Sequence, residues 1–270
     1  MLGTALCWSV VGILVRANSQ SPLLICGVIS LIALLFCLIV IRPTLVVSPL
    51  VMAAGTCSFL MMITFYGANQ LTTVGNAVVL QYCSTAFVVM YQAVDERRLP
   101  EAVRVGVVLL ALVGMVLFFF DELTVDGIVG NALAIVSGAF FGLMFYLNSK
   151  LGAAPLCSSM VGWTLAVVVG LAAVPSLPQV APEEWGSMVV QSLVCTCLAS
   201  VLFAYGIVRV PALSANMICM SEVVLAPLWA YLLFGEAFGR FAFLGAALIV
   251  ASIILNLLVD RHTSKRLAMC

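Results

Sequence analysis

The sequence places one carboxyl group inside an apolar run. Residues 218–236 read ICMSEVVLAPLWAYLLFGE, and Glu222 is the only acidic or basic residue that we place near the centre of such a run. Removal from water disfavours the charged form of a carboxyl group, unless a cation lies beside it. We therefore expect Glu222 either to take up and release a proton or to pair with an ammonium group of a small molecule. A neutral glutamic acid that joins two helices by a hydrogen bond is the structural alternative.

The composition is that of a membrane protein. Of the 270 residues, 64% are hydrophobic and 8% are charged, and the mean hydropathy is +1.26. A helix of about 20 apolar residues spans the hydrocarbon core of a bilayer. The ten apolar segments, cut at charged residues and prolines, are 2–17, 22–42, 49–70, 73–94, 102–120, 127–148, 157–174, 187–208, 212–234 and 241–259. We predict an all-α integral membrane protein with ten transmembrane helices, and we place Glu222 about 15 Å from either end of the ninth.

Lysine and arginine indicate the orientation, because they are enriched in loops on the cytoplasmic side of a membrane. With the N-terminus inside, nine of the 11 Lys and Arg residues fall in inner loops or in the C-terminal tail, and only Arg16 and Arg240 fall outside. We therefore predict a multi-pass protein of a bacterial-type cytoplasmic (inner) membrane, with both termini in the cytoplasm.

The two halves of the chain share polar landmarks at matching spacings. Tyr66, Asn76, Glu96 and Gly106 in the first half correspond to Tyr205, Asn216, Glu236 and Gly245 in the second. The interval from Asn to Glu is 20 residues in both halves. Because five is an odd number of helices, two five-helix copies cross the membrane in opposite directions. We predict two inverted five-helix repeats, at 1–122 and 127–260, followed by a cytoplasmic tail at 261–270.

The same layout resembles a known family. The first helix is short and carries Trp8, the helices that end at Glu96 and Glu236 are each followed by a glycine-led helix, and the order is five helices plus five. This arrangement resembles the EamA-type transporters of the drug/metabolite transporter superfamily over essentially the whole chain. The resemblance implies a central cavity, alternating access, and export or exchange of small metabolites such as amino acids. Two positions depart from the family: Tyr82-Cys83 stands where helix four often has a proline, and the proline of helix nine is displaced to Pro227.

The repeat predicts which side chains share a cavity with Glu222. Tyr82 and Glu222 each lie 14 residues before the acidic residue that ends their helix, so we expect Gln81 and Tyr82 to face Glu222 across the pseudo-symmetry axis. Trp229, seven residues after Glu222, falls on the same helix face and would form an apolar wall. An interhelical hydrogen bond for Gln81 and Tyr82, and a place at the membrane interface for Trp229, are the alternatives. The candidate substrate-binding residues are Glu222, Gln81, Tyr82, Trp229, Tyr205, Tyr66 and Trp8, with Glu222 also the candidate for proton coupling.

No motif in the sequence indicates catalysis or a metal site. The chain has no GxSxG, HExxH or GxxxxGK pattern, and most of its 10 cysteines lie in apolar runs, where a thiol behaves as a small hydrophobe. The pair Gly138 and Gly142 predicts close packing between helices. We expect no enzyme activity, no catalytic residue, no cofactor, no metal and no nucleic-acid partner.

A secondary transporter is the leading hypothesis from the sequence. Its expected partners are the lipid bilayer, a small-molecule solute and, as a further candidate, protons. A membrane binding or scaffold protein that does not transport, and a channel, are the alternatives. A channel would show conductance without saturation by substrate, and a scaffold would show no solute flux that depends on Glu222.

Overall fold

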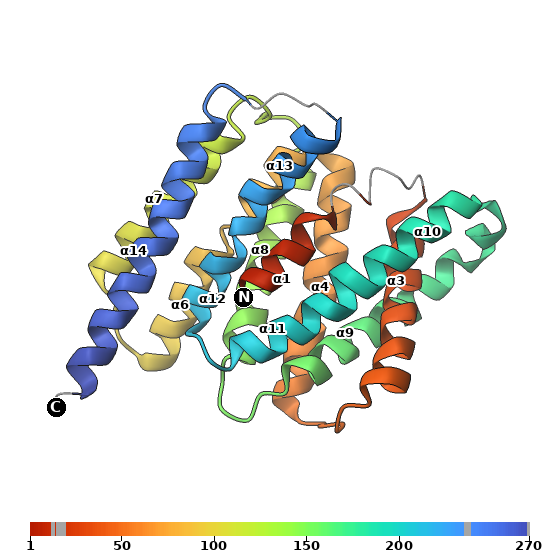
Figure 1. Cartoon of the computed structure of the whole chain (residues 1–270), viewed down its shortest axis with the longest axis horizontal. Helices are drawn as coiled ribbons and strands as arrows, with labels where there is room; N and C mark the ends of the chain where they lie inside the picture. Colours follow the sequence, from red (N-terminus) through yellow and green to blue (C-terminus); the bar gives the residue numbers. More distant parts are fainter. Residues whose placement is uncertain (12–13, 15–19, 235–238, 269–270) are drawn as a thin grey trace.

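The computed structural model describes the chain except residues 12–13, 15–19, 235–238 and 269–270. All the regular elements in the described ranges are helical, and they pack into one bundle (Figure 1). In the first half these elements are α1 (Leu2–Ser9), α3 (Pro22–Phe36), η1 (Cys37–Ile41), α4 (Pro49–Leu71), α5 (Val74–Gln81), α6 (Ser84–Glu96) and α7 (Ala102–Phe118). In the second half they are α8 (Ile128–Asn148), α9 (Pro155–Gly170), η2 (Leu171–Gln179), α10 (Pro182–Val190), η3 (Gln191–Leu198), α11 (Ala199–Ile207), α12 (Ala212–Cys219), α13 (Ser221–Phe234) and α14 (Ala242–Ala268).

Eight helical stretches of the described chain are long and apolar enough to cross a membrane, and α7, with 17 residues, is a shorter apolar helix. The prediction of an all-helical, multi-pass membrane protein is therefore confirmed. Each predicted segment from 22–42 onward falls on a helix of the structure. The first segment coincides with α1 only in part, because several of its residues, Arg16 among them, lie outside the described ranges, as does Glu236.

Two helix boundaries differ from the prediction. The eighth predicted segment begins at 187, whereas α10 begins at Pro182. Proline is tolerated at the first position of a helix, and the Ala181 N–H donates to Oε2 of Glu184 at 3.0 Å, so this end is well capped. The last helix continues past the predicted end at residue 259, since α14 extends to Ala268.

The helices of the two halves interleave. In the first half, α4 packs against α8 and α9, while α3 packs against α9 and η3. At one side of the bundle α7 and α14 lie side by side (Figure 1), and a β-carbon at Gly245 would lie 2.6 Å from the Gly114 carbonyl oxygen. Each half therefore buries its surfaces mainly on helices of the other half.

The fourth and ninth predicted helices are each interrupted near the middle. Helix four breaks between α5 and α6 at Tyr82-Cys83, and helix nine breaks between α12 and α13 at Met220. The backbone tightens at both places, because the N–H of Cys83 donates to the Leu80 carbonyl and the N–H of Val223 to the Met220 carbonyl. Interrupted helices at midmembrane depth present free backbone groups and side chains to the interior of a bundle.

Two glycines of α8 hold the first interruption in place. A β-carbon at Gly138 would lie 2.6 Å from the carbonyl oxygen of Gln81, and one at Gly142 would lie 2.8 Å from that of Ser84. Real β-carbons do not approach backbone oxygens so closely, so glycine is required at both positions. The predicted close packing of Gly138 and Gly142 is confirmed, and it fixes the backbone that carries Gln81 and Tyr82.

Candidate functional site

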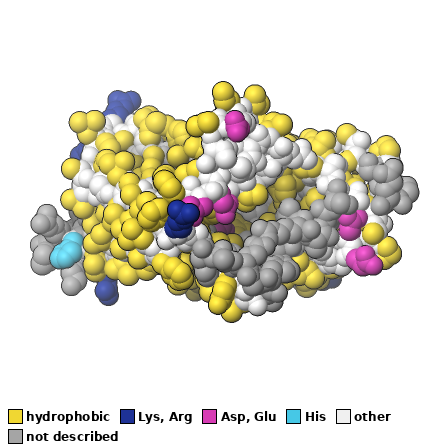
Figure 2. Space-filling model, turned by 90° about the horizontal axis from the view of Figure 1, so that it is seen from above, with side chains coloured by type: hydrophobic (Ala, Val, Ile, Leu, Met, Phe, Trp, Pro, Cys, Tyr) yellow, Lys and Arg dark blue, Asp and Glu magenta, His cyan; other side chains and the backbone are white. Residues whose placement is uncertain are grey.

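A cavity of about 620 Å³ lies between the two halves of the bundle. It extends from the interruptions at Tyr82 and Glu222 to the end of the molecule where α7 finishes and α14 begins, near Phe119 and Gly239. Figure 2 looks onto this end and shows acidic side chains gathered beside a hollow near its centre. The cavity is therefore open toward one end of the bundle.

Tyr82 and Glu222 meet at the inner end of this cavity. Tyr82 is fully buried, and its hydroxyl donates a hydrogen bond to Oε1 of Glu222 and lies 3.4 Å from the carbonyl oxygen of Cys219. The second carboxyl oxygen of Glu222, Oε2, is buried and has no hydrogen-bond partner in the described part of the chain. The structure thus brings together the two residues that the predicted repeat relates, with one carboxyl oxygen of Glu222 held by Tyr82 and the other buried without a described partner.

Gln81 lines the cavity beside this pair and is held by a chain of hydrogen bonds. Its amide Nε2 donates to Oγ of Ser137 on α8 at 3.0 Å, and that hydroxyl donates to the Met61 carbonyl on α4 at 2.9 Å. Gln81 is 6% exposed, so its side chain is fixed rather than freely rotating.

Tyr66 and Gln191 form a second polar pair on the cavity wall. The Gln191 amide Nε2 donates to the Tyr66 hydroxyl at 3.3 Å, and within the described residues the buried Oε1 of Gln191 has no partner. Tyr66 is among the residues predicted from the sequence, whereas Gln191 is not. A lone large amide in an apolar helix, together with the helix start that Pro182 marks, is the sequence signal for Gln191.

An aromatic cluster forms the apolar part of the site. The ring of Trp8 lies 5.9 Å from Phe141 and 6.2 Å from Phe203, and Tyr82 lies 5.9 Å from Phe141 in an edge-to-face arrangement. All four residues line the cavity. Aromatic faces carry partial negative charge, so they bind apolar groups and attract organic cations.

Two of the residues expected from the sequence do not line the cavity. Trp229 contacts a residue of the cavity wall but does not line the cavity itself. Its Nε1 donates to Oγ of Ser9 at 2.9 Å, and Ser9 lines the cavity. Tyr205 lies on the outer surface of α11, where it is 66% exposed and its ring lies 3.7 Å from the guanidinium of Arg209. Of the seven candidates, Glu222, Gln81, Tyr82, Tyr66 and Trp8 are brought together.

The charged residues that are described in the cavity wall are acidic. Glu222 and Glu122 line it, whereas no Lys, Arg or His is found among the described residues of its wall. In a low-dielectric site two carboxyl groups disfavour anions and favour neutral or cationic solutes. The described residues contain no group of three His, Cys, Asp or Glu side chains that could hold a metal ion.

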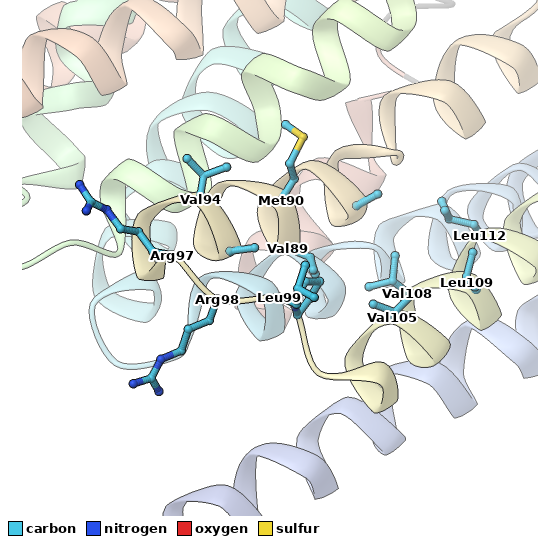
Figure 3. Close-up of a pocket in the computed structure, with 13 residues that line it drawn as sticks. Val89, Met90, Val94, Arg97, Arg98, Leu99, Val105, Val108, Leu109 and Leu112 are labelled. Carbon is cyan, nitrogen blue, oxygen red and sulfur yellow. The ribbon is translucent and has the colours of Figure 1, made fainter.

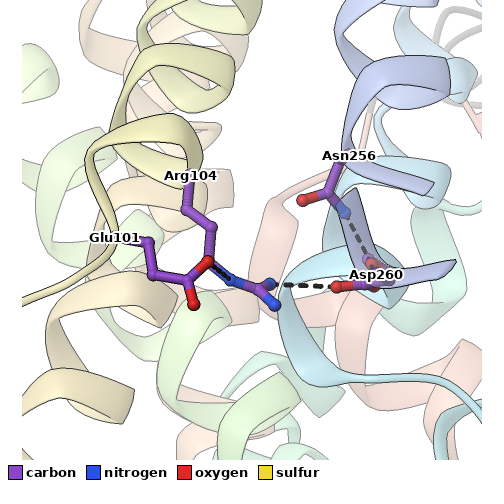
Figure 4. A network of polar contacts seen from close by, with 5 residues as sticks. Glu101, Arg104, Asn256 and Asp260 are labelled. Carbon is purple, nitrogen blue, oxygen red and sulfur yellow. Dashed lines mark hydrogen bonds and ion pairs between the residues drawn. The ribbon is translucent and has the colours of Figure 1, made fainter. Parts of the chain in front are cut away.

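Polar contacts join the helices at the end opposite the cavity mouth (Figure 4). Asp260 of α14 pairs with Arg104 of α7 at 3.0 Å and accepts a hydrogen bond from Ser214 of α12. Deeper in the bundle, the amide of Asn216 donates to Oγ of Ser84 at 3.2 Å, so Asn216 joins α12 to α6. These contacts close the bundle beneath the Tyr82 and Glu222 pair.

Comparison with known proteins finds similarity to transporters and a shared fold. The model of the EamA-like transporter family matches residues 128–258. An uncharacterized transporter of Archaeoglobus fulgidus is 27% identical over 208 residues, which cover 73% of this chain and 72% of the relative. The uncharacterized transporter YwfM of Bacillus subtilis is 28% identical over 218 residues, 76% of this chain and 72% of the relative. A protein crystal structure superimposes with a TM-score of 0.79 at 16% identity, covering 97% of both chains, and so shares the fold.

Proposed function

We propose that the chain is a secondary transporter of small organic metabolites, and the match of residues 128–258 to the EamA-like transporter family supports this proposal. The observation that carries the proposal is the Tyr82 and Glu222 pair at the inner end of an open cavity. A volume of about 620 Å³ suits a solute of amino-acid size, since ligand sites of roughly 300–1,000 Å³ are usual.

The substrate in this proposal carries an ammonium group and an apolar body. The carboxyl group of Glu222, which lines the cavity, pairs with the ammonium group, and the rings of Trp8 and Phe141 pack against the apolar part. The amides of Gln81 and Gln191 hydrogen-bond to the remaining polar groups. Amino acids and other small amines fit this description, because neutral amides can bind a carboxylate that the acidic cavity otherwise disfavours.

Proton coupling is the second part of the proposal. When the substrate leaves, the carboxyl group of Glu222 is left in a buried, largely apolar site with Tyr82 as its only described hydrogen-bond partner. Desolvation then favours uptake of a proton, and arrival of a cation favours its release. Glu222 therefore exchanges a proton for the substrate, which drives export or exchange across the cytoplasmic membrane.

Alternating access in a ten-helix bundle is the third part. Interruptions at equivalent places in helices four and nine, and interleaved packing of the two halves, support two inverted repeats at 1–122 and 127–260. The structure has one open end and one closed end, so transport requires the Arg104 and Asp260 contact to separate while the present mouth closes. With both termini in the cytoplasm, the open end faces outward.

The test begins with a substrate screen. Thermal stabilisation of the purified chain is measured over amino acids, amines and nucleotides, and flux of the stabilising compound is then measured in liposomes at several pH values. Glu222→Gln keeps the size of the side chain and an acceptor for Tyr82, but it removes the charge and the titrating proton. We expect folded protein with lost or pH-independent flux. The exposed Glu96→Gln is the matched control and keeps wild-type flux.

Wild-type flux with an unchanged pH profile in Glu222→Gln would show that Glu222 only joins two helices. Conductance that does not saturate with solute would identify a channel. Absence of flux for every stabilising compound would favour a binding protein.

A further inference from the structure

A second hollow, of about 560 Å³, lies on the outside of the bundle between α6 and α7 (Figure 3). It arises because α6 packs mainly against α8 while α7 packs mainly against α14, so the facing sides of α6 and α7 contact each other little. Val89 and Val108 form the buried floor, and Met90 of α6 and Leu109 of α7 form the walls. The α6–α7 connection closes one end of this groove.

The groove faces the hydrocarbon layer of the membrane. Its large apolar side chains are exposed, with Val94 at 72%, Leu99 at 95% and Leu109 at 56%. The helix to which Val94 belongs is part of a stretch long and apolar enough to span a bilayer. Exposed apolar side chains at such positions contact lipid chains and not water.

Two arginines mark the closed end of the groove. Helix α6 ends with Arg97 in the left-handed conformation, at a φ of 51°, and the Arg98 N–H donates back to the Ala93 carbonyl at 3.1 Å. In Figure 3 both guanidinium groups extend past the helix end, away from the apolar side chains. They lie where the polar layer of a bilayer begins.

The carboxylates near these arginines that form ion pairs do so with other cations. Asp95 pairs with Lys150 at 2.5 Å, and Arg104 pairs with both Glu101 at 3.4 Å and Asp260 at 3.0 Å. The segment from Glu96 to Arg98 then holds two arginines against one glutamate, and neither arginine forms an ion pair with a described residue. An anionic group at this place is therefore attracted.

We propose that this groove binds an anionic phospholipid, with one acyl chain between α6 and α7 and the phosphate on Arg97 and Arg98. A guanidinium group matches a phosphate with two parallel hydrogen bonds, and basic residues beside a membrane-spanning helix favour anionic head groups. The groove supplies the apolar half of the recognition and the arginines supply the selectivity for charge. Nothing in this site overlaps the central cavity.

Lipid retention by the full chain tests the proposal. The purified protein in neutral detergent is titrated with phosphatidylglycerol or with phosphatidylcholine of the same chains, and bound lipid is counted by native mass spectrometry. We expect wild-type protein to retain phosphatidylglycerol more tightly. The double variant Arg97→Gln/Arg98→Gln should weaken phosphatidylglycerol binding by about 30-fold, because each arginine contributes about one kcal/mol near an anionic head group, and leave phosphatidylcholine binding unchanged.

Arg42→Gln is the matched control, since Arg42 is exposed and also adopts the left-handed conformation at a helix end, with a φ of 49°. It should leave lipid retention unchanged. Ala93→Phe fills the groove while both arginines remain, and it should weaken phosphatidylglycerol binding as well. Equal affinity of the wild type for both lipids, or full retention of phosphatidylglycerol by the double variant or by Ala93→Phe, would overturn the proposal.

Discussion

Gly138→Ala tests whether α8 fixes the interruption in helix four. A β-carbon at residue 138 would lie 2.6 Å from the Gln81 carbonyl oxygen, and ordinary contact begins at 3.4 Å. The two backbones must therefore separate by about 0.8 Å, because neither atom belongs to a flexible side chain. The same movement strains the hydrogen bond of 3.0 Å from Gln81 Nε2 to Ser137 Oγ, because a lengthening of about 0.5 Å takes it beyond hydrogen-bond range.

Overpacking of this kind costs about 1–3 kcal/mol. We expect Gly138→Ala to lower the midpoint of thermal unfolding in detergent and to lower solute flux in liposomes, since Gln81 and Tyr82 move with the displaced backbone. Gly106→Ala in α7 is the matched control, because a β-carbon there meets no atom within 4 Å. It should keep wild-type flux and gain up to about 1 kcal/mol from helix propensity.

Equal thermal midpoints and equal flux for the two alanine variants would refute the reasoning, because the clash would then relax without moving the interruption. Lower stability with unchanged flux would limit Gly138 to a packing role.

Three further outcomes follow from the contacts of the site. Tyr82→Phe removes the hydroxyl that holds Glu222 and should lower stability by about 1–3 kcal/mol with a loss of flux; an unchanged unfolding midpoint would mean that the carboxyl group finds another donor. Arg104→Gln leaves Asp260 without its ion pair. Because a hydrogen bond between charged groups is lost, the free energy of unfolding, measured by heat or denaturant, should fall by about 1.5–3 kcal/mol. Wild-type stability would show that solvent replaces the pair. Trp229→Phe loses one hydrogen bond to α1 and should lower the free energy of unfolding by about 1 kcal/mol. Solute affinity, measured by thermal shift, should change less in Trp229→Phe than in Tyr82→Phe. A larger change in Trp229→Phe would place Trp229 in the site.

The sequence allowed most of the helices to be predicted, because hydrophobicity over about 20 residues determines whether a segment enters a membrane. Segments 22–42 and 49–70 agree with the observed Pro22–Ile41 and Pro49–Leu71 to within a residue. Prolines begin both helices, and serine side chains cap them, so these ends carry local signals.

The helix interruptions were not predictable from local signals. No proline or glycine marks Tyr82-Cys83 or Met220, and Pro227, which does carry a breaking signal, lies inside α13. The first interruption depends instead on the approach of α8 at Gly138, a contact made by distant parts of the chain. Tertiary packing of this kind leaves no periodic trace in the sequence.

Two side chains of the second half lie at positions that the predicted helix boundaries and the predicted repeat do not give correctly. With a helix start at residue 187, Gln191 falls one turn from the membrane surface; with the observed start at Pro182, it lies about 14 Å deep, in the cavity wall. The predicted repeat pairs Tyr205 with Tyr66, yet Tyr205 lies on the outer face of α11. A predicted repeat indicates how deep a residue lies along its helix. The direction in which its side chain points also depends on the rotation of that helix about its own axis.

The interleaving of the two halves has a consequence for biosynthesis. Gln81 enters the membrane 56 residues before its partner Ser137 is made, and Tyr82 enters it 140 residues before Glu222. At roughly 5–20 residues per second, the second interval lasts on the order of ten seconds or longer. During that time the polar groups of the first half have lipid, water or the insertion machinery as neighbours. The nascent first half therefore depends on a protected environment at the site of insertion until α8 and then α13 arrive.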